Sequence, residues 1–387
     1  MTVKKKKKRR VRKSLLVILV IIIAGAFLIH YVPRERKKTE LKDLGYQKET
    51  IEKILELDYY DKIIENKYYS KLLESKINND TLNLKYIDLY ANIKSDDKDI
   101  DETDILLYSR LEDKGYDNLQ LNSLFDKLEF YEITPLLVFD YQWDEISYIE
   151  DCLKNRENNS EAAFSLNGDY KQLYRITDEA KDPNSNYVLV NKNHYLLDTY
   201  EPNDLVEFSD RYAIPGMAVR KEVADAATVM LEDAIQAGIP FYVSSAYWSY
   251  AQLEEVYNGN IPIYRDDVDF YVNRPGFSEH QTGLCFNITP TYENPDNYLD
   301  SPIYAWIKEN CVSYGFILRY PLNKSTITNM QDEPTHLRYL GKDLAKRVSE
   351  SSLTYDEYYS LYLSAWRDES FKPDEEILNS IENYNKK

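Results

Sequence analysis

A single apolar stretch near the N-terminus is the strongest constraint on how this 387-residue chain can fold. It extends over the 18 residues from Leu15 to Val32, and the part up to Ile29 contains no polar side chain. At about 1.5 Å per residue, a helix of this length nearly matches a bilayer core of about 30 Å. The sequence therefore predicts a transmembrane helix over residues 14–32, and everything after it must fold as a separate body.

The charges beside this stretch predict its orientation. Residues 1–13 carry nine Lys or Arg and no acidic residue, so the positive-inside rule places this basic segment in the cytoplasm and the main body outside the cell. The small residues Ala24, Gly25 and Ala26 resemble a signal-peptide cleavage site, which is the alternative interpretation. Because the apolar stretch continues past them and Arg34 follows, we expect an uncleaved single-pass anchor in the cell membrane.

The charge of the chain reverses beyond residue 38. That part holds 35 of the 48 Lys and Arg residues and 65 of the 66 acidic residues, a net charge of −30. Because such a body repels nucleic acid and anionic lipid headgroups, no nucleic-acid partner is expected. The three cysteines are few and odd in number for an exported protein, so no disulfide framework is implied.

Two regions follow the anchor. Residues 39–165 have apolar residues at helical spacing and predict an all-helical extracellular region. Leu44-Gly45-Tyr46 has an echo in Lys114-Gly115-Tyr116, and each glycine fits the end of a short helix. Two interpretations stay open for this region: a spacer or arm that binds a protein partner, and an irregular helical bundle without one.

Residues 158–186 are polar and predict a linker, after which residues 186–360 alternate between strand and helix patterns. Residues 361–387 are expected to form a helical or polar tail. The alternation predicts an α+β domain. We expect strands at 188–190, 239–243 and 316–318, a helix over 219–237 closed by Gly238, and a helix over 306–314 stopped by Gly315.

Two of the four histidines of the chain lie in strings suited to a metal site. His280 is followed seven positions later by the side-chain oxygen of Asn287, and His336 is preceded by Glu333. Two imidazoles and one oxygen ligand, with a fourth position open, are a common arrangement for catalytic zinc. A carboxylate such as Glu333 that is not a ligand can act as the general base.

The strings at 275–287 and 333–339 resemble the VanY-type zinc D-alanyl-D-alanine carboxypeptidase family, which has S-x-H-x-x-G-x-A-x-D followed by E-P-W-H-x-R-Y. The resemblance covers residues 186–360 and implies an α+β carboxypeptidase-like domain with a small antiparallel sheet. It implies zinc as the cofactor and peptidoglycan stem peptides as the partner. The implied site residues are Glu333 as catalytic base; His280, Asn287 and His336 as metal ligands; and Ser278, Trp248, Gln252 and Arg338 as substrate-binding residues, with a structural salt bridge as the alternative for Arg338.

The chain departs from the family pattern at three functional positions. Asn287 replaces the Asp ligand, Trp248 replaces an Arg, and Thr335 replaces a Trp. A neutral amide brings no charge to the metal, and an indole cannot form a bidentate pair with a carboxylate. We therefore expect weak or absent zinc binding and a domain that recognises the end of the stem peptide with reduced or lost catalysis. The alternative is an active zinc carboxypeptidase that trims terminal D-Ala.

The remaining expectations concern Cys285 and the source of the chain. Cys285 stands at the small Ala position of the family pattern, which favours a packing role. The excess of Tyr, Lys, Asn, Ile, Asp and Glu is typical of an AT-rich genome. Together with the single anchor and the wall-directed family, it indicates an extracellular cell-wall protein of a Gram-positive bacterium.

Overall fold

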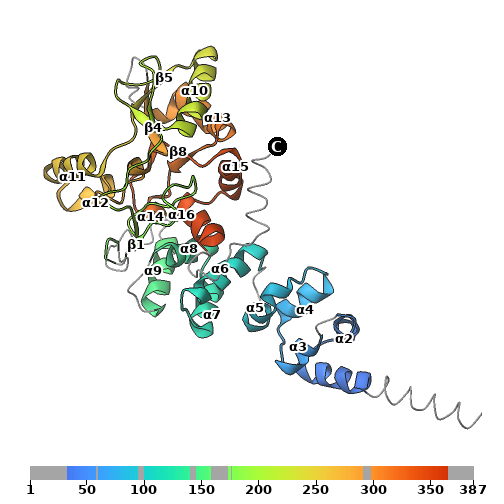
Figure 1. Ribbon diagram of the computed structural model, residues 1–387. Coiled ribbons are helices and arrows are strands. Elements are labelled where there is room, and N and C mark those ends of the chain that lie inside the picture. The colour runs from blue at the N-terminus through green and yellow to red at the C-terminus, as the bar shows by residue number, and fades with distance from the viewer. Residues whose placement is uncertain are drawn as a thin grey trace, which may run out of the picture. The chain divides into compact units, whose positions relative to one another are not determined.

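The computed structural model describes residues 33–57, 60–94, 100–139, 145–157, 173–175, 177–290 and 298–364 (Figure 1). The predicted anchor over residues 14–32 and the tail from residue 365 onward lie outside these residues. Among the described residues, no helix is both long and apolar enough to cross a membrane. The contacts divide the chain into two compact units: residues 1–109 with 117–126, and residues 110–116 with 127–387.

The described part of the first unit is built from short helices. Residues 33–44 are helical, and the next elements are α2 (Lys48–Ile54), α3 (Tyr60–Glu65), α4 (Lys71–Asn78), a 3-10 turn at Leu84–Tyr86, α5 (Ile87–Asn92), α6 (Glu102–Asp113) and α7 (Asn118–Lys127), of which α6 and α7 each extend into the second unit. Each of the α-helices buries at least one aliphatic side chain, whereas the 3-10 turn buries none; Leu41, Ile54 and Leu73 are completely inaccessible. Because helices this short are marginal alone, their stability comes from this packing.

The two repeated glycine strings close helices in the same way, as their sequence predicts. Gly45 and Gly115 both have positive φ angles, 119° and 104°. The amide of the following tyrosine then donates to a carbonyl five residues back: Tyr46 to Leu41, and Tyr116 to Leu111. A residue without Cβ is favoured here because the left-handed backbone disfavours other residues.

The second unit contains two helices that precede the α+β region in sequence. These are α8 (Phe130–Val138) and α9 (Glu145–Glu157). Within the unit, α8 meets α16 (Tyr355–Tyr358) near the end of the described chain, where the buried hydroxyl of Thr134 donates to Glu357 Oε1 at 2.8 Å. The α+β part is therefore packed together with helices from well upstream.

A four-stranded antiparallel sheet forms the centre of this unit. Its order is β5 (Phe241–Ser245), β6 (Cys285–Pro290), β8 (Glu333–Tyr339) and β7 (Phe316–Tyr320). Small two-stranded pairings join β1 (Asp178–Glu179) to β2 (His194–Tyr195) and β3 (Leu205–Glu207) to β4 (Ala218–Arg220). The α+β class and the small antiparallel sheet are confirmed.

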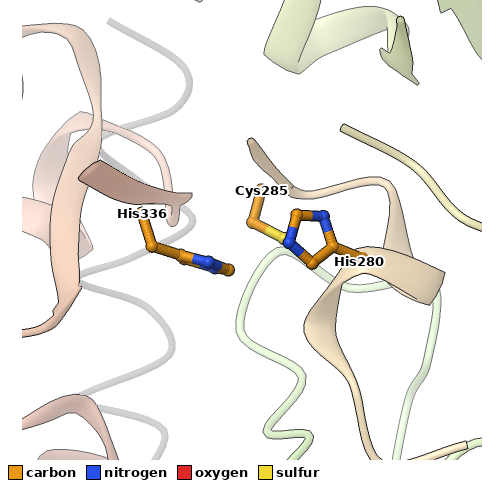
Figure 2. Close-up of side chains that lie close together, drawn as sticks. All are labelled: His280, Cys285 and His336. Atoms are coloured by element: carbon orange, nitrogen blue, oxygen red, sulfur yellow. The ribbon is translucent and has the colours of Figure 1, made fainter. Parts of the chain in front are cut away.

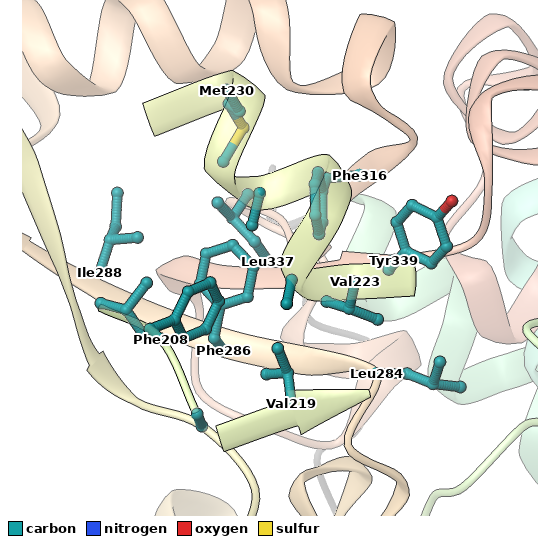
Figure 3. Close-up of a cluster of buried hydrophobic side chains, with 14 of the residues drawn as sticks. Phe208, Val219, Val223, Met230, Leu284, Phe286, Ile288, Phe316, Leu337 and Tyr339 are labelled. Atoms are coloured by element: carbon teal, nitrogen blue, oxygen red, sulfur yellow. The ribbon is translucent and has the colours of Figure 1, made fainter. Parts of the chain in front are cut away.

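One face of the sheet packs on the main hydrophobic core (Figure 3). Phe286 and Ile288 of β6 and Leu337 of β8 point into it, toward α10 (Lys221–Gln236) and α13 (Pro302–Asn310). Because side chains alternate along a strand, Cys285, Asn287, His336 and Arg338 must point to the opposite face. The remaining described helical elements are α11 (Tyr250–Tyr264), α12 (Val268–Tyr271), α14 (Ser325–Thr328), α15 (Lys342–Ser351), 3-10 turns at Arg265–Asp267, Glu279–Thr282, Tyr298–Asp300 and Cys311–Tyr314, and a π-helical turn at Tyr359–Leu363.

The strand predicted at 188–190 is wrong. Val188, Leu189 and Val190 are almost completely buried, but they form no strand. The guanidinium of Arg338 donates to the Val188 carbonyl at 2.7 Å, so a side chain satisfies a backbone acceptor that a neighbouring strand would otherwise take. The apolar triplet correctly predicted that this segment is buried, but it wrongly predicted that the segment pairs with a neighbouring strand.

Candidate functional site

His280 lies on a 3-10 turn that leads directly into the central strand β6. The hydroxyl of Ser278 caps this turn by accepting from the His280 amide at 3.3 Å. Gly283 then reverses the chain with a φ angle of 67°, and a Cβ there would lie 3.1 Å from the Arg220 side chain. Glycine is favoured here, because both the left-handed backbone and the close neighbours disfavour a side chain.

The two histidines predicted as ligands face each other across this site (Figure 2). Their ring centroids are 5.0 Å apart. Asn287 of β6 is paired directly with His336 of β8 in the antiparallel register, so the two side chains share one face of the sheet. The structure thus brings the three residues His280, Asn287 and His336 together from two separate strings.

Cys285 is a third member of the cluster. Its sulfur and one ring nitrogen from each of His280 and His336 all lie within 4.8 Å of one another, a spacing at which a metal ion can be held. The side chain of Cys285 is completely buried. Burial raises the pKa of its thiol, but the two adjacent imidazoles lower that pKa to about 7 overall.

The hydrogen bonds of the imidazoles leave nitrogen atoms available to a ligand. His280 Nδ1 lies 2.5 Å from the Ala246 carbonyl, which places the proton on Nδ1 and an acceptor lone pair on Nε2. His336 is buried, and neither of its ring nitrogens makes a hydrogen bond of good geometry with any described residue. Buried polar atoms normally have hydrogen-bond partners, so the ring nitrogens of His336 are suited to binding a ligand.

Two carboxylates flank His336. Glu333 Oε2 lies 3.3 Å from Nδ1, and Glu279 Oε2 lies 3.9 Å from Nε2. The side-chain amide of Asn287 donates to Glu333 Oε1 at 3.0 Å. Burial raises the pKa of Glu333, but the close contact with His336, the charges of both imidazoles and the Asn287 amide together hold that pKa below its usual value. Glu333 is therefore an ionised carboxylate that can accept a proton.

A buried charge network lies behind the histidines and contains Arg338. Glu279 Oε1 accepts from Arg338 Nη1 at 2.7 Å and from Arg319 Nε at 2.8 Å. Arg319 also pairs with Asp356 at 2.5 Å, and all four side chains are at most 1% exposed. The two negative carboxylates and the two positive guanidinium groups neutralise one another. Such pairing is needed because an unpaired buried charge is strongly destabilising. The structure therefore favours the salt-bridge alternative for Arg338, since its guanidinium does not reach the open side of the site.

A pocket of about 390 Å³ opens on the sheet face that carries the histidines. Its lining includes Glu333, Ser278 and Trp248, and the described residues that line it include no Lys or Arg. The Trp248 indole donates to Ser245 Oγ at 2.8 Å. Gln252 does not line the pocket; its carboxamide caps the start of α11 by accepting from the Ser249 amide at 2.9 Å.

From sequence, Cys285 is expected to have a packing role and is not placed in the site. The missed signal is the alternation of side chains along a strand: a residue two positions before Asn287 must lie on the same face. Its approach to both imidazoles also depends on the turn over Glu279–Thr282, which the sequence does not specify.

Residues 216–342 match the family model described as "VanY: D-alanyl-D-alanine carboxypeptidase". The putative carboxypeptidase YodJ of Bacillus subtilis is 36% identical over 220 residues, which are 54% of this chain and 80% of that protein. VanXYC of Enterococcus gallinarum, a bifunctional D-Ala-D-Ala dipeptidase and carboxypeptidase, is 31% identical over 182 residues, covering 44% of this chain and 92% of that protein. The solved structure of the LdcB LD-carboxypeptidase is 36% identical, covers 47% of this chain and 89% of its own, and superposes with a TM-score of 0.44. The chain belongs to the VanY family of D-alanyl-D-alanine carboxypeptidases.

Proposed function

We propose that the C-terminal domain is a metal-dependent carboxypeptidase that removes the terminal residue of peptidoglycan stem peptides. The observation that carries this proposal is the meeting of two imidazoles, buried at His336 and half-buried at His280, with the carboxylate Glu333 in one pocket. Relatives support the substrate class: one solved structure is VanYB in complex with D-alanine-D-alanine, and another holds VanY with Zn(II). The donor set of this chain fits a zinc ion, because it offers imidazole nitrogen in a buried, polar, incompletely bonded cluster.

In this proposal each residue of the site has a separate role in the hydrolysis. A zinc ion, when bound, supplies a Lewis acid that polarises the scissile carbonyl and makes water more acidic. Glu333 accepts the proton of the attacking water and returns it to the leaving amine. Asn287 fixes the orientation of that carboxylate through its amide bond to Oε1. Because no described cation lines the pocket, hydroxyl groups such as that of Ser278 are left to bind the terminal carboxylate of the substrate.

The test is hydrolysis of a peptide that ends in D-Ala-D-Ala by the full chain in detergent. We expect release of D-alanine that a chelator stops and zinc restores. Glu333→Gln should lower the rate by at least about 100-fold, since general-base catalysis is typically worth about 10²–10⁴-fold. The variant should retain bound zinc, because Glu333 is assigned no ligand role. Equal rates in the two proteins would contradict the proposal.

A second candidate is a binding module that recognises the same peptides without cleaving them. It is favoured by Trp248, which stands where the family pattern has an arginine and whose indole is bonded to Ser245. If the full chain binds the peptide in calorimetry while releasing no D-alanine at saturating zinc, this second candidate replaces the first. Under the enzyme proposal, binding and release occur together.

We further propose that residues 14–32 anchor the protein in the cell membrane of a Gram-positive bacterium, with the N-terminus in the cytoplasm and the main body outside. The apolar stretch and its nine flanking basic residues support this arrangement. The helical region then serves as a spacer or as a surface for a protein partner. Added protease should remove the main body from intact protoplasts; full protection of that body would contradict the orientation.

A further inference from the structure

We propose that Cys285 is the third protein ligand of the metal, together with His280 and His336. The inference rests on the proposed function, since it concerns the same metal. In the family pattern the third ligand is an aspartate at the position of Asn287, and the position of Cys285 is an alanine. In this chain the anionic ligand is instead Cys285, two residues before Asn287 on β6. The protein ligands are then one thiolate and two imidazoles.

The geometry favours the thiol. The Cys285 sulfur and one nitrogen of each imidazole lie within 4.8 Å of one another (Figure 2). A tetrahedral zinc ion with bonds of about 2.3 Å to sulfur and 2.0–2.1 Å to nitrogen needs its ligands about 3.5 Å apart. Small side-chain rotations close that difference. Catalytic zinc sites use three protein ligands drawn from imidazole, thiolate and carboxylate, with the fourth position left open.

The neighbouring charges favour an anionic ligand, because Glu333, the one carboxylate other than Glu279 described beside His336, is assigned the role of general base and not of ligand. The two acids and two arginines of the buried network balance one another, so the network has no spare negative charge for a dication. Asn287 contributes none. A thiolate at Cys285 restores the single negative ligand that the family pattern supplies with aspartate.

Asn287 has a separate task in this arrangement. Its amide nitrogen donates to Glu333 Oε1 at 3.0 Å and lies 3.5 Å from Thr335 Oγ1. An aspartate at 287 could not donate to Glu333 and would repel it. The Cys285 and Asn287 substitutions are therefore complementary: the thiolate takes the ligand role, and the amide is free to hold the general base.

The weak zinc binding expected from the sequence assumed that the neutral Asn287 amide was the third ligand. With a thiolate ligand, the native chain should bind zinc stoichiometrically. Asn287→Asp should add little in the presence of Cys285 and much in its absence. This dependence of one substitution on the other separates the two ligand sets.

The experiment uses the full chain in detergent, loaded with Co²⁺ in place of zinc. A thiolate ligand gives an intense sulfur-to-cobalt charge-transfer band in the near ultraviolet, which imidazole and amide ligands do not give. We expect the band in the native protein, its loss in Cys285→Ala and Cys285→Ser, and its retention in Cys311→Ser, which removes a different buried cysteine.

Zinc affinity, measured by competition with a chromophoric chelator, is the second readout. Cys285→Ala should weaken zinc binding by at least about 100-fold, the upper end of what loss of an outer-shell partner costs. Cys285→Ala with Asn287→Asp, which recreates the family ligand set, should regain most of the affinity without the charge-transfer band. Circular dichroism of the metal-free proteins checks that each variant folds.

The outcomes distinguish the two proposals. Cobalt binding by the native chain without the band, or unchanged zinc affinity in Cys285→Ala, would overturn the Cys285 assignment and leave the metallopeptidase proposal intact. Absence of any zinc or cobalt binding by the folded native chain would overturn both. Because both Cys285→Ala and Cys285→Ser are tested, and absence of the band from the native protein by itself overturns the assignment, the test stands even if one variant fails to fold.

Discussion

At the scale of single residues, the carboxylate of Asp269 is held by hydrogen bonds from two neighbouring side chains. Its carboxylate accepts two bonds from Arg274, at 2.7 and 3.0 Å, and one from Tyr257 at 2.8 Å. Burial raises the pKa of Asp269, but the hydrogen bonds from Arg274 and Tyr257 outweigh it and hold that pKa below its usual value. The folded state therefore favours the ionised form more than the unfolded chain does, and stability depends on pH.

Asp269→Asn should destabilise the protein most at neutral pH. The sign follows from the lowered pKa: the carboxylate contributes stability above its unfolded pKa of about 3.9, and this contribution is lost as pH falls through the folded value. Because Arg274 is 44% exposed and water screens the pair, we expect about 1 kcal/mol at pH 7. Urea unfolding at pH 7 and pH 3 measures it, with the exposed Asp267→Asn as control. A difference from the native protein that is as large at pH 3 as at pH 7 would show that shape, and not charge, is responsible.

The individual site residues differ in how far sequence predicts them. His280, His336 and Glu333 were predicted from two strings, because metal ligands and bases demand particular side chains at particular spacing. Cys285 was not predicted as a site residue, because a thiol is compatible with both packing and ligation, and only the three-dimensional position of its sulfur between two imidazoles distinguishes them. Arg338 was ambiguous for a related reason, since its partners come from residues about 150 and 59 positions away in sequence.

At the scale of elements, the turn into β7 depends on one glycine. Gly315 ends the turn at Cys311–Tyr314 with a φ angle of 90°, and a Cβ there would lie 3.0 Å from backbone atoms of Gly341 and Lys342. This close approach brings the start of β7 against the end of β8, the strand that carries His336 and Glu333. Sequence predicted the stop at Gly315 and the strand after it, since a glycine following an apolar helix is a common helix end.

Gly315→Ala should cost about 2 kcal/mol or more, because it combines a disfavoured backbone with contact against rigid backbone atoms. Gly238→Ala is the matched control. Its φ angle is also positive, 76°, but nothing lies within 4 Å of the added methyl group, so only about 1 kcal/mol is expected. Chemical denaturation of both variants measures the difference. Equal losses would mean that the close approach at Gly315 contributes nothing.

The helix over Lys221–Gln236 and the strand at Phe241–Ser245 were predicted within a few residues, because each has a long or clearly bounded apolar pattern. The segment at 188–190 was not, because a short apolar triplet is equally compatible with a strand and with a buried loop. Its true environment is set by a guanidinium from β8, a contact that no local pattern contains.

At the scale of the whole molecule, the chain divides into an N-terminal unit of short helices and a unit that contains the sheet and the candidate site. The division does not follow sequence order strictly, since residues 110–116 and α8 and α9 belong to the sheet-containing unit. Composition predicted a helical region followed by an α+β domain. It could not predict that α8 joins the latter through Thr134 and Glu357, which lie 223 positions apart.

Removal of residues 1–38 should leave a soluble, folded protein. That segment contains the only apolar stretch of membrane length in the sequence, and the remainder carries a net charge of −30, which opposes association. Size-exclusion chromatography and circular dichroism of the truncated chain in detergent-free buffer measure this. Aggregation of the truncated chain, with the full chain monodisperse in detergent, would contradict the separation of anchor and body.

The most direct measurement is a crystal structure of the zinc-loaded protein with anomalous diffraction recorded at the zinc edge. We predict one anomalous peak about 2.3 Å from Cys285 Sγ and about 2.0–2.1 Å from one nitrogen of each of His280 and His336. A peak held by the Asn287 side-chain oxygen with the Cys285 sulfur outside bonding distance would contradict the thiolate ligand. No peak at saturating zinc would contradict the metal site itself.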